Sequence, residues 1–193
     1  MSIPRPESHP GAYFEQLGIT PSLRSRIMEA ALSRGGEDCD LYFQHSAATG
    51  VRLSDSKVNQ ANMSQDLGMG VRVVVGDQVG YSYSEDLRPA SLVEAARAAA
   101  SIAASTPGRT AQPSKPGLLP DLYGAEQPWD QVSIETRVGM VRSWEQEAFS
   151  HDPRVNRVTA YLADATTVVM IVRPDGRLVE DWRPMTMAYI QCT

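Results

Sequence analysis

The chain has 193 residues, of which 42% are hydrophobic and 21% charged, so it can bury a sizeable core and is expected to be globular. Its formal net charge of -5 argues against a nucleic-acid partner, because affinity for nucleic acid depends mainly on lysine and arginine that neutralise phosphates. No stretch approaches the roughly 18 apolar residues of a membrane span. We therefore expect no membrane partner and a cytoplasmic location. Cys39 and Cys192 lie far apart in the sequence, which fits a reduced compartment.

The sequence predicts a tail over residues 1–19, followed by a first helix. Thr20-Pro21 supplies a capping residue and a proline at the first helical position, and Leu23 and Ile27 follow at helical spacing. Gly35-Gly36 ends this helix.

Short strands are predicted next, over 40–46, 49–54 and 57–64, with Asp55-Ser56 as a turn. The strand 57–64 is polar and is typical of a sheet edge. Two valine-rich strands follow on either side of Gly76-Asp77, a pair that suits a type II′ hairpin turn. Together these segments predict a meander of about five strands.

The glycines of the stretch GMGVRVVVG raise the question of a phosphate-binding loop. Such a loop needs a helix N-terminus after it, but Gly68-Met69-Gly70 is followed by the β-branched run 71–75. The glycines are therefore assigned a structural role. Tyr81 and Tyr83 share one face of the next strand, where they either line a groove or, as is more common, pack across strands.

A second helix is predicted from Ser91, because Ser91 and Glu94 form a capping-box pattern and an alanine-rich run follows. Its expected apolar face contains Leu92, Ala96, Ala99 and Ile102. Residues 107–132 are rich in proline and glycine and predict a long connection.

The rest of the chain predicts a helix over 133–150 and strands over 155–163, 166–173 and 178 to the end, with a turn at 174–176. Shifting the sequence by about 119 positions aligns residues 159–176 with residues 40–57. A helix followed by three strands would then occur twice, although alternating strands also resemble one another by chance. The predicted fold is a mixed α/β domain of the α+β type, with a largely antiparallel meander sheet and about three helices.

The residues alone do not complete an active site. His9, His45 and His151 are widely separated and none has a partner at metal-ligand spacing. A nucleophile motif of the type GxSxG is absent from the sequence. No catalytic, cofactor-binding or metal-binding residue is therefore assigned.

The order of motifs nevertheless resembles a known family. DLYFQ at 40–44, QDLGMGVRVVVGDQVGYSYSED from Gln65, the alanine-rich helix and RPDGRLVEDWRP from Arg173 resemble the N-terminal half of the TldD/PmbA family, in particular its TldD branch. The similarity covers residues 20–193. The residues that carry the family motif, with an expected structural role, are Gly68, Gly70, Arg72, Gly76, Gly80 and Asp86.

The resemblance implies a zinc-dependent metallopeptidase that breaks down or trims peptides and unfolded segments, as a homodimer or with a related second subunit. The family's HExxxH metal motif lies in its C-terminal half, and this sequence contains neither histidine of that motif. We therefore expect the metallopeptidase domain to lie outside this chain, zinc to belong to the full-length protein, and this chain alone to be inactive. The alternative is a regulatory protein-binding module, because family members were also named modulators of DNA gyrase. The coding sequence beyond residue 193 separates the two.

Two strands are candidates for binding a peptide by strand addition. One is the polar strand, with Lys57, Asn59, Ala61 and Met63, and the other is the final strand. Both edges are equally compatible with being covered by the rest of a longer protein. The final strand is apolar on both faces, so we expect it to fray or to mediate dimerisation.

Overall fold

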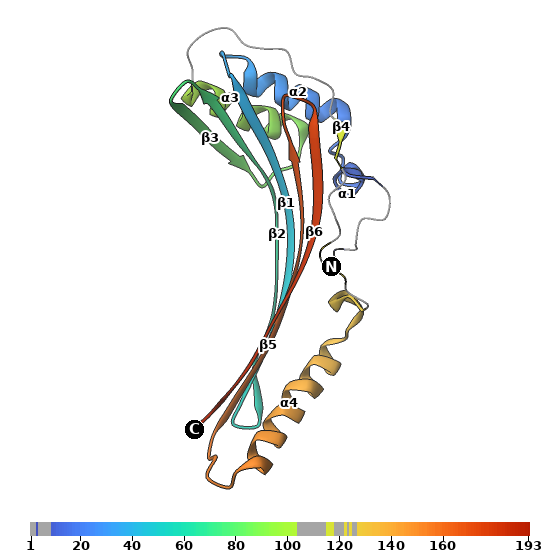
Figure 1. Ribbon diagram of the computed structural model, residues 1–193, viewed down its shortest axis with the longest axis vertical. Helices are drawn as coiled ribbons and strands as arrows, with labels where there is room; N and C mark the ends of the chain where they lie inside the picture. The colour runs from blue at the N-terminus through green and yellow to red at the C-terminus, as the bar shows by residue number, and fades with distance from the viewer. Residues whose placement is uncertain (1–2, 4–8, 104–114, 118–121, 123, 125–126) are drawn as a thin grey trace.

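The computed structural model describes residues 3, 9–103, 115–117, 122, 124 and 127–193. One open sheet runs through the molecule with the strand order β3-β2-β1-β5-β6-β4 and bows from end to end (Figure 1). Its neighbouring strands are antiparallel except for the short β4, which is parallel to β6. The predicted α+β class is confirmed. The strands are β1 (Asp38–Ser54), β2 (Lys57–Val75), β3 (Gln78–Ser84), β4 (Lys115–Pro116), β5 (Val158–Val172) and β6 (Arg177–Cys192).

Three of these strands, β1, β2 and β5, are much longer than the sequence predicts, whereas β6 matches the strand predicted from 178 to the end. β1 has 17 residues, β2 has 19, β5 has 15 and β6 has 16, whereas an average strand has about 5 or 6. The breaks predicted at 47–48 and 164–165 lie inside β1 and β5. Polar side chains there pair across the ladder, as Ser46 Oγ and Thr167 Oγ1 do at 2.8 Å. Because both strands have neighbours on either side, these polar segments remain extended.

The predicted turns are confirmed. Asp55 and Ser56 both have positive φ, 52° and 59°, as a type I′ turn between β1 and β2 requires. Gly76 has φ 55° between β2 and β3, and Gly176 has φ 85° between β5 and β6.

Within the described part of the chain, four α-helices accompany the sheet, and two of them begin where the sequence predicts. Thr20 Oγ1 accepts a hydrogen bond from the Leu23 amide at 3.3 Å, and Ser133 Oγ accepts one from the Thr136 amide at 3.2 Å. The capping box predicted at Ser91 is wrong, because the third helix begins at Pro89 and the Ser91 hydroxyl donates to Asp86. The helices are α1 (Ala12–Gln16), α2 (Pro21–Leu32), α3 (Pro89–Ile102) and α4 (Ile134–His151).

Two segments predicted to lack regular secondary structure contain helices or a strand. The segment predicted as a tail, 1–19, carries α1, whose Phe14 is fully buried. The connection predicted over 107–132 falls largely outside the described residues. Its described part includes β4 and a 3₁₀ helix at Trp129–Gln131.

The repeated unit contains two strands rather than three. α2 is followed by the hairpin β1–β2, and α4 is followed by the hairpin β5–β6. The strands predicted over 155–163 and 166–173 are one strand, which explains the difference. β3 belongs to the first unit only.

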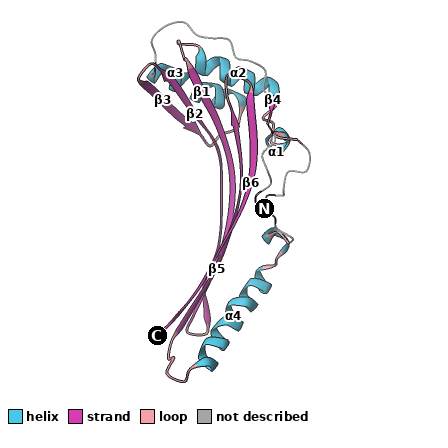
Figure 2. Cartoon of the chain, in the orientation of Figure 1, coloured by secondary structure: helices cyan, strands magenta, loops and turns pink. Residues whose placement is uncertain are grey.

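All four helices lie against the same face of the sheet. Successive side chains of a strand alternate between faces, and the odd-numbered residues of β1 contact both hydrophobic cores. At one end, α1, α2 and α3 cover Leu41 and Phe43, and at the other, α4 covers Val51 and Leu53. We call these the α2–α3 end and the α4 end; Figure 2 shows the helices gathered at them.

Candidate functional site

The opposite face of the sheet is free of helices in the described part of the chain, and we call it the helix-free face. The motif residues Gly68, Gly70 and Arg72 lie on it, with Tyr42 of β1 beside Gly70. Across the next ladder, Tyr83 pairs with Gly70 and Tyr81 with Arg72. The motif recognised in the sequence therefore lines an exposed surface.

The two glycines on this face permit close approach of their neighbours. A Cβ at Gly70 would lie 2.8 Å from the Tyr81 hydroxyl oxygen, because the Tyr81 ring lies over this position. A Cβ at Gly68 would lie 2.9 Å from the Ser84 carbonyl oxygen. Both glycines are inside a strand, so they neither turn the chain nor precede a helix N-terminus.

Tyr81 and Tyr83 line a groove instead of packing in the core. Their side chains are 59% and 70% exposed. Packing in the core is therefore wrong for this pair, whereas cross-strand packing is found for Tyr81, whose ring lies over Gly70 of the neighbouring strand. The sequence could not show this, because the alternation of a strand does not reveal which face is covered.

Two adjoining hollows lie on the helix-free face at the α2–α3 end. The first, the arginine hollow, has a volume of about 500 Å³. The second, the glycine hollow, has a volume of about 490 Å³ and shares Tyr42, Gly70 and Tyr81 with the first. The arginine hollow is lined by Asp40, Tyr42, Gly70, Arg72, Tyr81, Ile171, Arg173, Arg177 and Val179.

A chain of ion pairs beside the arginine hollow joins β2 and β1 to Arg173, which directly follows β5. Arg72 Nε donates to Asp40 Oδ2 at 2.8 Å, and this hydrogen bond raises the pKa of Arg72. Arg173 NH1 lies 3.4 Å from Asp40 Oδ1, and its NH2 donates to Asp38 Oδ2 at 2.5 Å. Arg72 and Arg173 are thus held in place and largely neutralised.

The other motif residues contact the scaffold. A Cβ at Gly80 would lie 2.0 Å from the Ala99 carbonyl oxygen, so α3 packs directly on the backbone of β3. Asp86 accepts hydrogen bonds from the Arg88 amide at 3.0 Å and the Ser91 hydroxyl at 2.6 Å. The Arg88 guanidinium and these bonds lower the pKa of Asp86.

The predicted edge strand, 57–64, lies entirely within the part of β2 that forms an outer edge of the sheet. β2 pairs with β1 from Lys57 to Val74, but β3 covers only Met69 to Val75. Residues 57–68 therefore have a strand on one side only within the described part of the chain. We call this segment the outer edge.

The four candidate residues of the outer edge are all exposed but do not share one face. The register shifts between Arg52 and Leu53, and β2 has an extra residue there. Ala61 and Met63 consequently lie on the helix-covered side and Lys57 on the helix-free side. Bulges of this kind are common at sheet edges and cannot be read from alternation in one strand. The four residues are Lys57, Asn59, Ala61 and Met63.

The three histidines do not come together. His45 is buried, with Nδ1 2.6 Å from the Tyr13 hydroxyl and Nε2 2.6 Å from Gln65 Nε2, and burial lowers its pKa. His9 lies 3.5 Å from Glu15, and His151 ends α4. Among the described residues, no three His, Cys, Asp or Glu side chains are grouped so that they could hold a metal ion. The residues present thus do not fit a zinc site.

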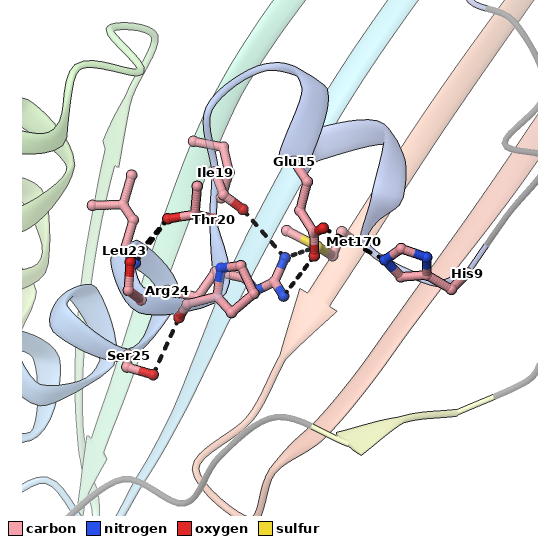
Figure 3. Close-up of polar contacts among 10 residues, drawn as sticks. His9, Glu15, Ile19, Thr20, Leu23, Arg24, Ser25 and Met170 are labelled. Carbon is pink, nitrogen blue, oxygen red and sulfur yellow. Dashed lines mark hydrogen bonds and ion pairs between the residues drawn. The ribbon is translucent and has the colours of Figure 1, made fainter.

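Several buried charges have no recognisable signal in the sequence. Arg24 lies under α1, where NH2 donates to Glu15 Oε1 at 3.1 Å and NH1 to the Ile19 carbonyl at 3.2 Å (Figure 3). Arg137 of α4 pairs with Asp164 of β5 at 3.1 Å, and both side chains are less than 10% exposed. The first pair joins two separate helices and the second joins a helix to a strand, so the periodicity of one element does not reveal either pair.

Two family models match the chain. One describes PmbA/TldA metallopeptidase domain 1 and matches residues 39–103, and the other describes the PmbA/TldA metallopeptidase central domain and matches residues 127–193. Both segments contribute strands to the single sheet. The chain belongs to the PmbA/TldD metallopeptidase family.

Relatives of known name agree with this assignment. A metalloprotease TldD homolog of Haemophilus influenzae is 30% identical over 174 residues, which is 86% of this chain and 36% of the relative. A second TldD homolog, from Buchnera aphidicola, is 31% identical over 75% of this chain and 30% of its own length. The chain thus spans about a third of the length of these relatives.

Solved structures share the fold. A proposed modulator of DNA gyrase from Bacteroides thetaiotaomicron superposes with a TM-score of 0.66 at 18% identity, covering 89% of this chain and 40% of that one. A similarly described protein from Thermotoga maritima has a TM-score of 0.63 at 15% identity, covering 89% of this chain and 42% of that one.

None of the helices in the described part of the chain is long and apolar enough to cross a membrane.

Proposed function

We propose that this chain is the non-catalytic N-terminal part, residues 20–193, of a TldD-like zinc metallopeptidase that breaks down or trims peptides and unfolded segments. Support comes from the family assignment and from the one-third share of the relatives' length that the chain spans. In this proposal the zinc and the hydrolytic groups belong to a C-terminal domain of the full-length protein. This part of the chain guides the peptide.

The outer edge of β2 is the observation that carries this role. Outer strands expose backbone N–H and C=O groups that can pair with an extended chain. Such pairing depends little on side-chain identity, which suits an enzyme that accepts varied unfolded segments. Residues 57–66 of this edge are polar or small apart from Val58 and Met63, so a peptide adds there without burying a large apolar surface.

Turnover by the isolated chain tests the division of labour. We expect the 193-residue chain with zinc to show no cleavage of an unstructured fluorogenic peptide. The full-length protein with zinc should cleave the same peptide and lose that activity with a chelator. Chelator-sensitive cleavage by the chain alone would show that the metal site lies inside it.

We assign the full-length protein a second subunit, either another copy or a related chain. Met185, Met187 and Ile190 near the end of β6 are exposed, and this half of β6 has β5 on one side only within the described residues. Light scattering on the chain and on the double variant Met185→Glu, Met187→Glu tests this edge. We expect a dimer that the variant converts to a monomer; a monomeric parent chain would contradict the assignment.

The regulatory alternative makes a different prediction. A module that acts only by binding a protein partner needs no zinc domain after residue 193. An HExxxH motif in the coding sequence downstream supports the peptidase, whereas a stop codon directly after residue 193 supports the module.

A further inference from the structure

The arginine hollow has an unbalanced positive charge. Three arginines approach it, and the two aspartates of the ion-pair chain neutralise two of them. The third, Arg177, is exposed, and its guanidinium makes no ion pair within the described part of the chain. Lys115 of β4 pairs with Arg177 across the sheet and is likewise exposed. This end of the hollow therefore favours an anion.

The arginine hollow also has an apolar wall. Tyr42, Tyr81, Ile171 and Val179 line it, and the lack of a side chain at Gly70 lets the Tyr81 ring lie against its floor. A ligand that fits must combine an anionic group with an apolar one. A volume of about 500 Å³ lies within the range usual for small-ligand sites.

The neighbouring glycine hollow carries the opposite charge. It shares Tyr42, Gly70 and Tyr81 with the arginine hollow and extends to Asp66 and Glu85. An extended ligand that crosses both hollows thus meets a positive end and a negative end. The direction in which a peptide lies is then fixed, because its C-terminus is negative.

We propose that the arginine hollow binds the C-terminal carboxylate of a peptide whose last side chain is apolar or aromatic. The carboxylate accepts hydrogen bonds from Arg177 and from guanidinium N–H groups of Arg173 that the aspartates leave free, while the last side chain lies between Tyr42 and Tyr81. Charge-assisted bonds of this kind are about twice as strong as neutral ones. The inference rests on the proposed function for its substrate class, since peptides are the ligands considered.

Calorimetric titration of the chain with three tetrapeptides tests this site. The first ends in phenylalanine with a free carboxylate, the second is its C-terminal amide, and the third is an amide with a glutamate in place of one internal residue. We expect the free acid to bind at least about tenfold more tightly than either amide, which is the effect of one charge-assisted pair. The glutamate-bearing amide shows whether the site requires a C-terminal carboxylate or accepts a side-chain carboxylate equally well.

A matched pair of arginine variants locates the effect. Arg177→Gln should bring the affinity for the free acid down to that for the amide. Arg97→Gln, at an exposed position of α3 on the other side of the sheet, should leave the tenfold preference unchanged. Circular dichroism of both variants checks that they are folded.

Several results would overturn the site. They are equal affinity for acid and amide, equal affinity for the glutamate-bearing amide, or an acid preference that persists in Arg177→Gln. A full-length enzyme that cleaves peptides but shows no acid preference leaves the proposed function intact and rejects this inference. If the chain prefers the free acid but the full-length protein has no peptidase activity, this inference stands and the proposed function is rejected.

Discussion

The two ends of the sheet differ in how completely the chain covers them. At the α2–α3 end three helices pack on β1 and its neighbours and bury a large core that includes Phe14, Ile27, Leu41 and Phe43. At the α4 end one helix buries a much smaller core. That core consists of Val51, Leu53, Val141, Ala160 and Leu162.

The outer strands show the consequence of this difference. Residues 61–66 of β2 and 185–192 of β6, toward the α4 end, are exposed on both faces. The α2–α3 end is therefore a stable support for the hollows, whereas the α4 end offers open strands to other polypeptide. One continuous sheet thus joins a densely packed end to an end with open outer strands.

The largest expected effect is on the support at the α2–α3 end. In Gly80→Ala the new Cβ meets the Ala99 carbonyl oxygen, 2.0 Å away, so α3 must move off the sheet. We expect a loss of about 4 kcal/mol in the free energy of unfolding, measured by urea denaturation. In contrast, Gly139→Ala in α4 meets nothing within 4 Å and should raise stability by up to about 1 kcal/mol. Equal effects of the two variants would contradict the packing described here.

The next effect concerns the buried ion pair that joins α4 to the sheet. Asp164→Asn leaves Arg137 charged without its partner, which should cost about 3 kcal/mol in urea denaturation. Asp152→Asn, which breaks the exposed pair with Arg154, is the control and should change stability little. If the two substitutions cost the same, the Arg137–Asp164 pair does not hold α4.

A smaller effect is a pH dependence that arises under α1. Burial raises the pKa of Glu180 from its ordinary 4.5 to about 7. Between these values the folded chain holds a proton that the unfolded chain releases, so stability falls as pH rises through this window. Glu180→Gln should remove this slope and be more stable than the parent by roughly 1 to 2 kcal/mol above about pH 8, after allowance for solvent screening. Thermal unfolding across this pH range measures the slope, and an unchanged slope in the variant would rule out Glu180 as its source.

The smallest effect on stability is expected at Gly70. The Cβ in Gly70→Ala meets the hydroxyl end of Tyr81, which can rotate away at little cost. We expect a change below about 1 kcal/mol, together with weaker binding of the free-acid peptide, because the displaced ring narrows the hollow. Calorimetry on the folded variant separates the two quantities; unchanged affinity would show that the ring position does not matter for binding.

Much of the fold could be predicted because turns and helix starts have local chemistry. Two helices begin at the capping residues that the sequence indicates, Thr20 and Ser133. Two hairpins turn at the pairs that it indicates, Asp55-Ser56 and Gly76-Asp77. Strand length could not be predicted, because the polar segment around Ser46 is kept extended by neighbours distant in sequence. A local turn signal therefore marks the end of a strand only where neighbouring strands do not keep the backbone extended through it.

The candidate site was predicted only in part. The motif containing Gly70 and Arg72 was recognised, but periodicity alone could not place it on an uncovered face beside Tyr42 and Tyr81. The ion-pair chain through Asp40 and the charge at Arg177 come from strands that meet only in the fold.

Amide hydrogen exchange along β2 tests most directly the central claim that an extended peptide adds to the outer edge. With an unstructured peptide at saturation, we expect the fast-exchanging amides within residues 57–68 to slow by at least about tenfold. The amides of Leu41 and Phe43 in β1 should not change, and a peptide N-methylated at alternate residues should have no effect. Saturating peptide that leaves exchange within 57–68 unaltered would contradict the claim.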